Sequence, residues 1–158
     1  MSEQTIISEE MKKAVGSLLN VKVSRIERRA VEEYVSATTD SNPLWQDDDF
    51  AMREGLGGAL VPPAFLLTMQ MEGGSPSDHM PSQAHLGGAV DGGGEWEFHR
   101  PVRVGDVITA VRRFVAINEK KGKLGPMVLN TFEVTYYNQR SEMVAKSRWT
   151  TIRYSTTS

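Results

Sequence analysis

The sequence contains no cysteine in its 158 residues. Without a thiol, the chain forms no disulfide bridge, no cysteine-ligated zinc site and no thiolate nucleophile. Residues 1–13, MSEQTIISEEMKK, also lack the apolar core and the small-residue cleavage site of a signal peptide. We therefore expect a cytoplasmic protein.

An excess of either charge is also missing, because 18 Lys and Arg residues stand against 20 Asp and Glu residues, for a formal net charge of -2. This balance does not favour nucleic-acid binding, which requires a basic surface. The most apolar segment extends for about ten residues, or about 15 Å as a helix, which is too short to cross a bilayer. We expect neither nucleic acid nor a membrane as a partner.

Histidine is scarce, with three residues in the chain: His79, His85 and His99. No pair of them has the spacing of metal ligands backed by carboxylates. We therefore expect no metal ion and no other cofactor. His99 lies between Phe98 and Arg100 at the end of a predicted strand, which favours a structural role for it.

The content of 39% hydrophobic residues is sufficient for one domain with a core, so we take residues 1–158 as a single domain. Its most apolar stretch follows Pro62 and Pro63, which fit the first turn of a helix. Residues 64–71, AFLLTMQM, include only two polar side chains. A helix that is apolar on nearly all sides must be surrounded by protein. A sheet is the natural surrounding.

The C-terminal half contains four runs in which apolar and polar residues alternate, with many β-branched and aromatic residues, and these runs predict strands. Helical spacing before the apolar segment predicts helices. The expected layout is α+β with an antiparallel meander, and the alternative is a decorated β-barrel. We expect strands near residues 21–26, 95–100, 106–117, 127–138 and 143–154, a peripheral helix from Ser8 to Leu19, a helix over residues 28–39, and a mobile loop from Glu72 to Gly94 that borders the site as a lid.

A polar turn, Asp40-Ser41-Asn42-Pro43, separates the helix over residues 28–39 from the apolar helix. Asp40 in such a turn either acts as a base or caps the turn by accepting a hydrogen bond from the backbone at Asn42. The two roles are compatible with each other. The turn is therefore the first candidate for a functional site.

Three segments together resemble the MaoC-like hydratase/dehydratase family, and in particular its N-terminal dehydratase-type domains. They are DSNPLW at residues 40–45, VPPAF at residues 61–65 and EWEFHRPVRVGD at residues 95–106. The resemblance covers nearly the whole chain. It implies the hotdog fold, in which a curved antiparallel sheet wraps around one central helix.

The resemblance also implies an activity, the addition of water to a trans-2-enoyl thioester or its removal in the reverse direction. The family motif is Gly-Asp-x-Asn-Pro-x-His, in which the Asp and the His hold the water. This chain has Asp40 and Asn42 at the motif positions, but it has Thr39 in place of the Gly and Trp45 in place of the His. An indole N–H only donates and moves no proton. We therefore expect a non-catalytic or partner-dependent subunit.

By the same resemblance, the substrate is carried as a thioester of coenzyme A or of an acyl-carrier protein, and backbone amides near the helix start stabilise the thioester oxygen. We expect a homodimer, or a heterodimer or heterotetramer with another MaoC-like subunit. His85 is a candidate to replace the missing histidine. The expected substrate-binding residues are Trp45, Val61, Pro63, Ala64, Phe65, Arg100 and Arg103.

Two other functions remain open at this point. Thioesterases are also common on hotdog folds, and a non-enzymatic acyl-thioester-binding or scaffolding module is compatible with Trp45. The Asp-x-Asn-Pro turn favours a hydratase or dehydratase over a thioesterase. Arg100 and Arg103 either hold a phosphate or belong only to the connection between strands.

Overall fold

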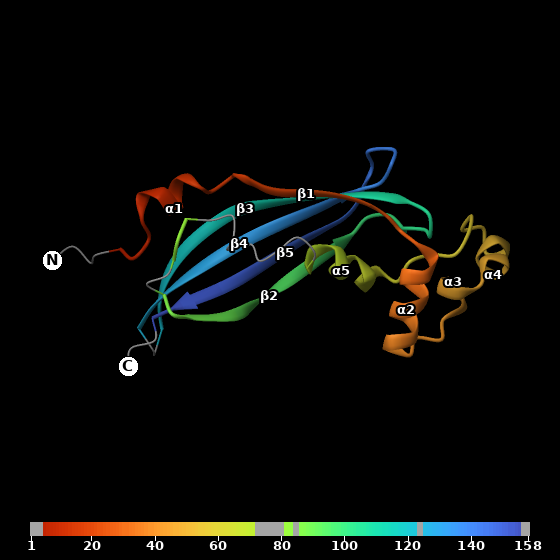
Figure 1. Ribbon diagram of the computed structural model, residues 1–158, viewed down its shortest axis with the longest axis horizontal. Coiled ribbons are helices and arrows are strands. Elements are labelled where there is room, and N and C mark those ends of the chain that lie inside the picture. Colours follow the sequence, from red (N-terminus) through yellow and green to blue (C-terminus); the bar gives the residue numbers. More distant parts are fainter. Residues whose placement is uncertain (1–4, 72–80, 84–85, 123–124, 156–158) are drawn as a thin grey trace.

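The computed structural model describes residues 5–71, 81–83, 86–122 and 125–155. Five strands form one antiparallel sheet in the order β1-β3-β4-β5-β2, so that β1 and β2 are its two edges (Figure 1). The strands are β1 Leu18–Arg25, β2 Gly88–Phe98, β3 Val107–Gly122, β4 Gly125–Tyr137 and β5 Met143–Tyr154.

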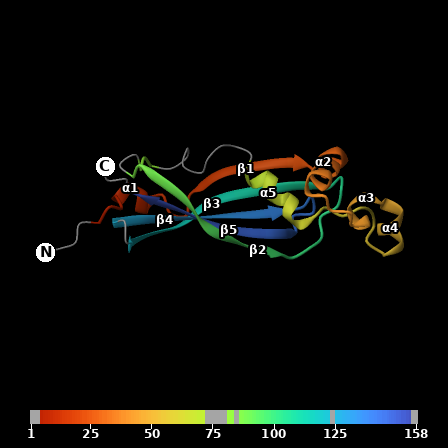
Figure 2. The ribbon, with the colours of Figure 1, turned by 90° about the horizontal axis from the view of Figure 1, so that it is seen from below.

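The helices gather at the two ends of the sheet and over its inner face, as Figures 1 and 2 show. α1 lies at one end, while α2, α3 and α4 lie beyond the other end. α5 lies against the sheet and follows a 3-10 turn at Pro63–Phe65. The helices are α1 Glu9–Lys13, α2 Arg28–Thr38, α3 Pro43–Gln46, α4 Asp48–Arg53 and α5 Leu66–Met71.

The N-terminal helix is shorter than the sequence predicts. Ser8 caps it by accepting from the Met11 N–H at 3.2 Å, as expected for a capped start. The helix ends at Lys13, however, and Gly16, with φ of 90°, turns the chain so that its N–H donates to the Phe114 carbonyl of β3. The prediction that the helix continues to Leu19 is wrong, because β1 begins at Leu18 and pairs with β3.

The second correction concerns the predicted loop from Glu72 to Gly94. Residues 72–80 lie outside the described residues, but residues 88–94 belong to β2 and pair with β5. A Cβ on Gly94 would lie 2.8 Å from the Trp149 ring and 2.9 Å from the Arg148 carbonyl. The glycines that suggest a loop therefore allow a close approach between strands. The lid prediction stays a prediction for the part that the structure does not describe.

The apolar helix is covered on one side only. Phe65, Leu66 and Met69 are buried against the sheet, with relative exposures of 7%, 2% and 5%. On the other side Ala64 is exposed, and Leu67 retains 37% of its surface. The prediction of burial on nearly all sides is therefore wrong for a single chain, because the sheet curves around one face of this short helix. The α+β layout with an antiparallel sheet and a helix on its inner face is confirmed.

Small side chains on β5 allow large ones to meet across it. Ala145 and Ser147 of β5 lie beside Phe98 and Trp96 of β2. The Trp96 ring reaches over them to stack on Tyr136 of β4, with ring centroids 5.5 Å apart. Tyr136 is completely buried, and this burial raises the pKa of its phenol to about 12, while Ser147 acts in the opposite direction.

Candidate functional site

The turn after α2 is built from consecutive caps. α2 ends at Thr38, and its C-cap residue Thr39 has a φ of 53°, in the left-handed region. Asp40 Oδ1 accepts the N–H of Asn42 at 3.0 Å, and Asn42 Oδ1 accepts the N–H of Leu44 at 3.0 Å. Pro43 then occupies the first turn of α3. The hydrogen bond expected between Asp40 and the backbone at Asn42 is present.

The second oxygen of the Asp40 carboxylate is also engaged. Asp40 Oδ2 accepts the indole N–H of Trp45 at 2.8 Å. Both carboxylate oxygens therefore hold N–H groups of this same turn. The sequence signals this pair only through the spacing of five residues between a carboxylate and a tryptophan.

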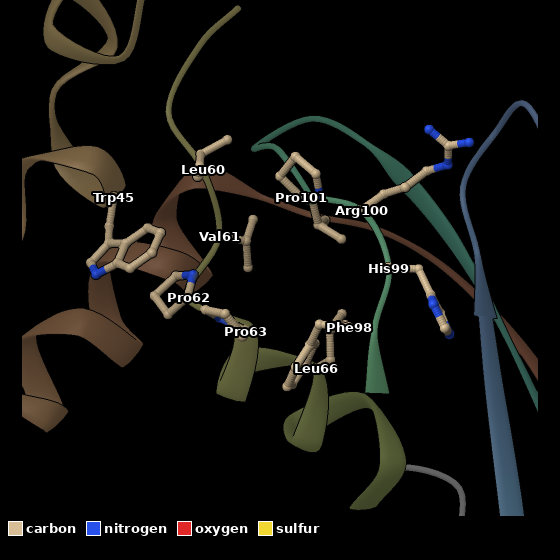
Figure 3. Close-up of a pocket in the computed structure, with 11 residues that line it drawn as sticks. Trp45, Leu60, Val61, Pro62, Pro63, Leu66, Phe98, His99, Arg100 and Pro101 are labelled. Carbon is tan, nitrogen blue, oxygen red and sulfur yellow. The ribbon is translucent and has the colours of Figure 1, made fainter. Parts of the chain in front are cut away.

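An apolar pocket of about 310 Å³ lies beside Trp45, between α3, α5 and the end of β2 (Figure 3). Four of the predicted binding residues line this pocket: Trp45, Val61, Pro63 and Arg100. Phe65, in the 3-10 turn before α5, is buried, and neither it nor Ala64 nor Arg103 is part of the lining. The remaining lining residues, which the sequence analysis did not assign to binding, are Leu60, Pro62, Leu66, Phe98, His99, Pro101 and Val102.

Backbone hydrogen bonds hold the pocket wall at Leu60 and Val61. The Leu60 N–H donates to the Leu44 carbonyl, and the Val61 N–H donates to the Val102 carbonyl, both at 2.8 Å. These bonds connect the chain after α4 to α3 on one side and to the segment after β2 on the other. Main-chain hydrogen bonds therefore fix the pocket wall, and the identity of the side chains does not predict such bonds.

Asp48, on α4, supports the same wall. Its Oδ1 accepts the Ala59 N–H at 2.9 Å, and its Oδ2 accepts from the Arg28 guanidinium at 2.5 Å. The hydrogen bond from Ala59 and then that from Arg28 lower the pKa of Asp48 below its ordinary value. Asp48 therefore joins α2, α4 and the residue that precedes Leu60.

The two predicted phosphate-binding arginines both have partners in the chain. The Arg103 Nε–H donates to the Leu56 carbonyl in the Gly-rich segment before the pocket wall. Arg100 points away from Val61 and lies 3.8 Å from a Glu142 oxygen (Figure 3). Their binding of a substrate phosphate stays a prediction.

The other predicted catalytic groups lie in different surroundings. His85 falls outside the described residues. His99 is 3.7 Å from Glu97, and its exposed side chain points away from Trp45 (Figure 3). Of the amides at the helix start, the Phe65 N–H donates to the Pro62 carbonyl at 2.9 Å. Among the described residues, no backbone acceptor outside the 3-10 turn contacts the Ala64 N–H.

Asp40 does not line the apolar pocket. It contributes instead to a polar depression of about 320 Å³ between the end of α2 and the turn. Glu32, Ser36 and Gln46 also line this depression. The aspartate and the apolar pocket therefore lie on different sides of the Trp45 indole.

Within residues 5–71, 81–83, 86–122 and 125–155, no three side chains of His, Asp or Glu come together in a way that would hold a metal ion. No helix in this part of the chain has the length and apolar character needed to cross a membrane.

Comparison with known proteins relates the chain to hydratases and dehydratases. The family described as "FAS1-like, dehydratase domain region" matches residues 13–147. A probable enoyl-CoA hydratase alpha subunit from Thermomonospora curvata is 29% identical over 138 residues, which cover 78% of this chain and 43% of that protein. The chain thus spans less than half the length of this relative.

Solved structures share the fold at low sequence identity. A chain of the ChsH1-ChsH2 complex from Mycobacterium tuberculosis aligns with a TM-score of 0.80 at 18% identity, covering 96% of this chain and 93% of that one. The C-terminally truncated HadBC (3R-hydroxyacyl-ACP dehydratase) complex from the same organism aligns with a TM-score of 0.72 at 18% identity, covering 88% and 96%. These alignments confirm the hotdog fold.

Proposed function

Because the chain belongs to the FAS1-like dehydratase-region family, a group of MaoC-like hydratase/dehydratase domains with the hotdog fold, we propose that it is the non-catalytic half of a two-subunit hydro-lyase. Its substrate class is a trans-2-enoyl thioester of coenzyme A or of an acyl-carrier protein. Hydration places the hydroxyl of a water molecule on C3 and a proton on C2, and dehydration reverses both steps.

The hydrogen bond from Trp45 to Asp40 carries this proposal. Hydration requires a group that takes a proton from water and a group that delivers one to C2. An indole N–H donates a hydrogen bond but does not exchange roles with an acceptor. Both oxygens of Asp40 already accept N–H groups of the turn, and its carboxylate lies outside the apolar pocket. The residues at the motif positions therefore do not supply the acid–base pair.

The apolar pocket supports the binding part of the proposal. Its lining of aliphatic and aromatic side chains suits an acyl chain, and the Ala64 N–H, at the helix start but outside that lining, is the proposed donor for a thioester oxygen. In the complex, this chain contributes pocket walls while the partner supplies the Asp and His of an intact motif.

Two observations support a second MaoC-like subunit as the partner. The relative from Thermomonospora curvata is named an alpha subunit, and both structural neighbours described above come from complexes. Ala64 in the 3-10 turn and Leu67 on α5 are exposed and also leave apolar surface for another chain to cover.

The direct test is reconstitution with a MaoC-like subunit that carries an intact Asp-x-Asn-Pro-x-His motif. We expect the complex to hydrate crotonyl-CoA or a longer enoyl-CoA, and the substitution Asp40→Asn in this chain to change kcat little. The matched substitution of the motif Asp in the partner should abolish turnover. Loss of turnover with Asp40→Asn in the assembled complex would contradict the proposal.

A further inference from the structure

The orientation of the Trp45 ring divides it into two functional parts. Its nitrogen is turned away from Val61, while its six-membered ring faces Pro62 and the pocket (Figure 3). The hydrogen bond to Asp40 satisfies the only polar atom of the indole. The surface that remains toward the pocket is therefore entirely apolar.

The ring also closes the pocket on the side of the polar depression. Trp45 lines the apolar pocket, Asp40 lines the depression, and their side chains are in contact at 2.8 Å. Neither residue lines both spaces. The indole ring therefore separates the apolar pocket from the Asp40 carboxylate and from the polar depression around it.

The ring needs a specific anchor, since α3 is only four residues long and a helix of this length has little stability of its own. The Asp40 carboxylate provides that anchor with one oxygen, while its other oxygen is bound to the backbone of Asn42 at the start of the same helix. A single side chain thus fixes both the helix start and the ring that the helix carries.

We propose that Trp45 sets the depth of the apolar pocket, and hence the length of the acyl chain that the protein accepts, and that Asp40 is the positioning residue that holds the ring in place. This inference rests on the proposed function for the chemical class of its ligand. It gives Asp40 and Trp45 a role in selectivity that is separate from proton transfer.

The test is equilibrium binding of saturated thioesters, which cannot be hydrated: butyryl-CoA, octanoyl-CoA and dodecanoyl-CoA, measured by titration calorimetry with the full chain. For the wild-type protein, we expect affinity to rise with chain length and then stop rising where the acyl chain reaches the ring. In Trp45→Leu the rise should continue, by about fourfold for each further methylene that is buried.

Asp40→Asn should shift the preference toward longer chains in the same direction but less far, because an amide oxygen accepts one N–H without the charge. Asp49→Asn, an exposed carboxylate on neighbouring α4, is the matched control and should leave the series unchanged. In the double variant Trp45→Leu with Asp40→Asn, the second substitution should have no further effect on chain-length preference, because Asp40 acts through the ring.

An unchanged chain-length series in Trp45→Leu would overturn the inference. The inference would also be overturned if Asp40→Asn weakened the binding of all three ligands equally. It would likewise be overturned if Asp40→Asn still changed chain-length preference in the Trp45→Leu background, because either result would indicate general destabilisation. Absence of binding by the wild-type chain would also overturn it, but would leave the proposed lack of turnover standing. Turnover of enoyl-CoA by the isolated chain would contradict the proposed function but would leave the inference about chain length standing.

Discussion

Thr39 is the residue under the clearest backbone strain near the site. It is the C-cap residue of α2 and has a φ of 53°, and a β-branched residue in the left-handed region is an outlier. Its neighbour Asp40 then begins the turn that carries Trp45. The geometry of the turn is therefore maintained against the preference of Thr39, by the caps that follow it.

Thr39→Gly should stabilise the protein by about 0.5–1 kcal/mol, because relief of the left-handed strain exceeds the extra chain entropy of glycine when unfolded. Urea denaturation measures this difference. Ala37→Gly, at an exposed position inside α2, is the control and should destabilise by about 1 kcal/mol. If Thr39→Gly lowered the free energy of unfolding as much as Ala37→Gly, Thr39 would not be strained.

Tyr136 should give the protein a specific dependence on high pH. Its pKa is raised from 10.0 to about 12 by burial, so the folded state holds the phenolic proton more tightly than the unfolded state. The resulting stability is complete below pH 10.0 and is lost as the pH rises toward about 12.

Over that range, the free energy of unfolding of the wild type should fall by about 2–3 kcal/mol more than that of Tyr136→Phe. Denaturation at several alkaline pH values measures both. Tyr137→Phe, the next residue of β4, is the control and should keep the wild-type pH dependence. Parallel curves for the wild type and Tyr136→Phe would contradict the assignment.

At the level of single residues, the sequence predicts contacts that are local. The hydrogen bond between Asp40 and the backbone of Asn42 follows from turn chemistry and is present. The contact of Asp40 with the Trp45 indole depends on how α3 turns the ring, and Arg103 meets Leu56 only after the chain has folded. Such contacts form only once the helices and strands are arranged in space, so the spacing of residues in the sequence does not predict them.

At the level of elements, alternation predicts β4 and β5 almost to the residue, because each has one buried and one open face. β2 is missed over residues 88–94, since its glycines carry no side-chain pattern, and Gly94 is required for packing against Trp149. The apolar helix is found, but its open face is not, because apolarity does not distinguish burial within a chain from burial against another chain.

The link that Asp48 makes between α2, α4 and Ala59 gives a prediction at this scale. Asp48→Ala removes a hydrogen-bond acceptor and one partner of an ion pair, so the free energy of unfolding should fall by about 1 kcal/mol. Because the pKa of Asp48 is lowered in the folded state, the wild type should lose this advantage as the pH falls through that lowered pKa.

Denaturation at neutral and acidic pH tests the prediction, with Asp49→Ala on the same helix as the control. The difference between the wild type and Asp48→Ala should be present at neutral pH and should narrow in acid. A difference that grows in acid would contradict the role assigned to the carboxylate.

At the scale of the whole molecule, both edges of the sheet expose apolar side chains. Val23 on β1 is 62% exposed and Val90 on β2 is 47% exposed. Sheet edges that carry exposed apolar side chains invite pairing with another chain. β2 also leads into Phe98, which lines the apolar pocket and is half exposed. A partner strand at β2 would therefore lie beside the pocket.

We expect the protein to form a dimer with itself or with a MaoC-like partner through the β2 edge. Val90→Lys should then weaken assembly, because a charge on that edge opposes strand pairing. Val23→Lys, the matched change on the β1 edge, should have little effect. Light scattering at micromolar concentration, with and without the partner, distinguishes the two, and a monomer under both conditions would refute the expectation.

The proposed non-catalytic role of this chain is tested most directly by the isolated, purified protein in a hydration assay. Crotonyl-CoA and a longer enoyl-CoA are followed through the loss of the conjugated thioester, with Asp40→Asn measured beside the wild type. We predict turnover lower than that of a complete acid–base site by about 10²- to 10⁴-fold, with the same kcat on crotonyl-CoA for the wild type and Asp40→Asn. Robust turnover by the isolated chain that disappears in Asp40→Asn would contradict the account, because Asp40 would then be a catalytic base.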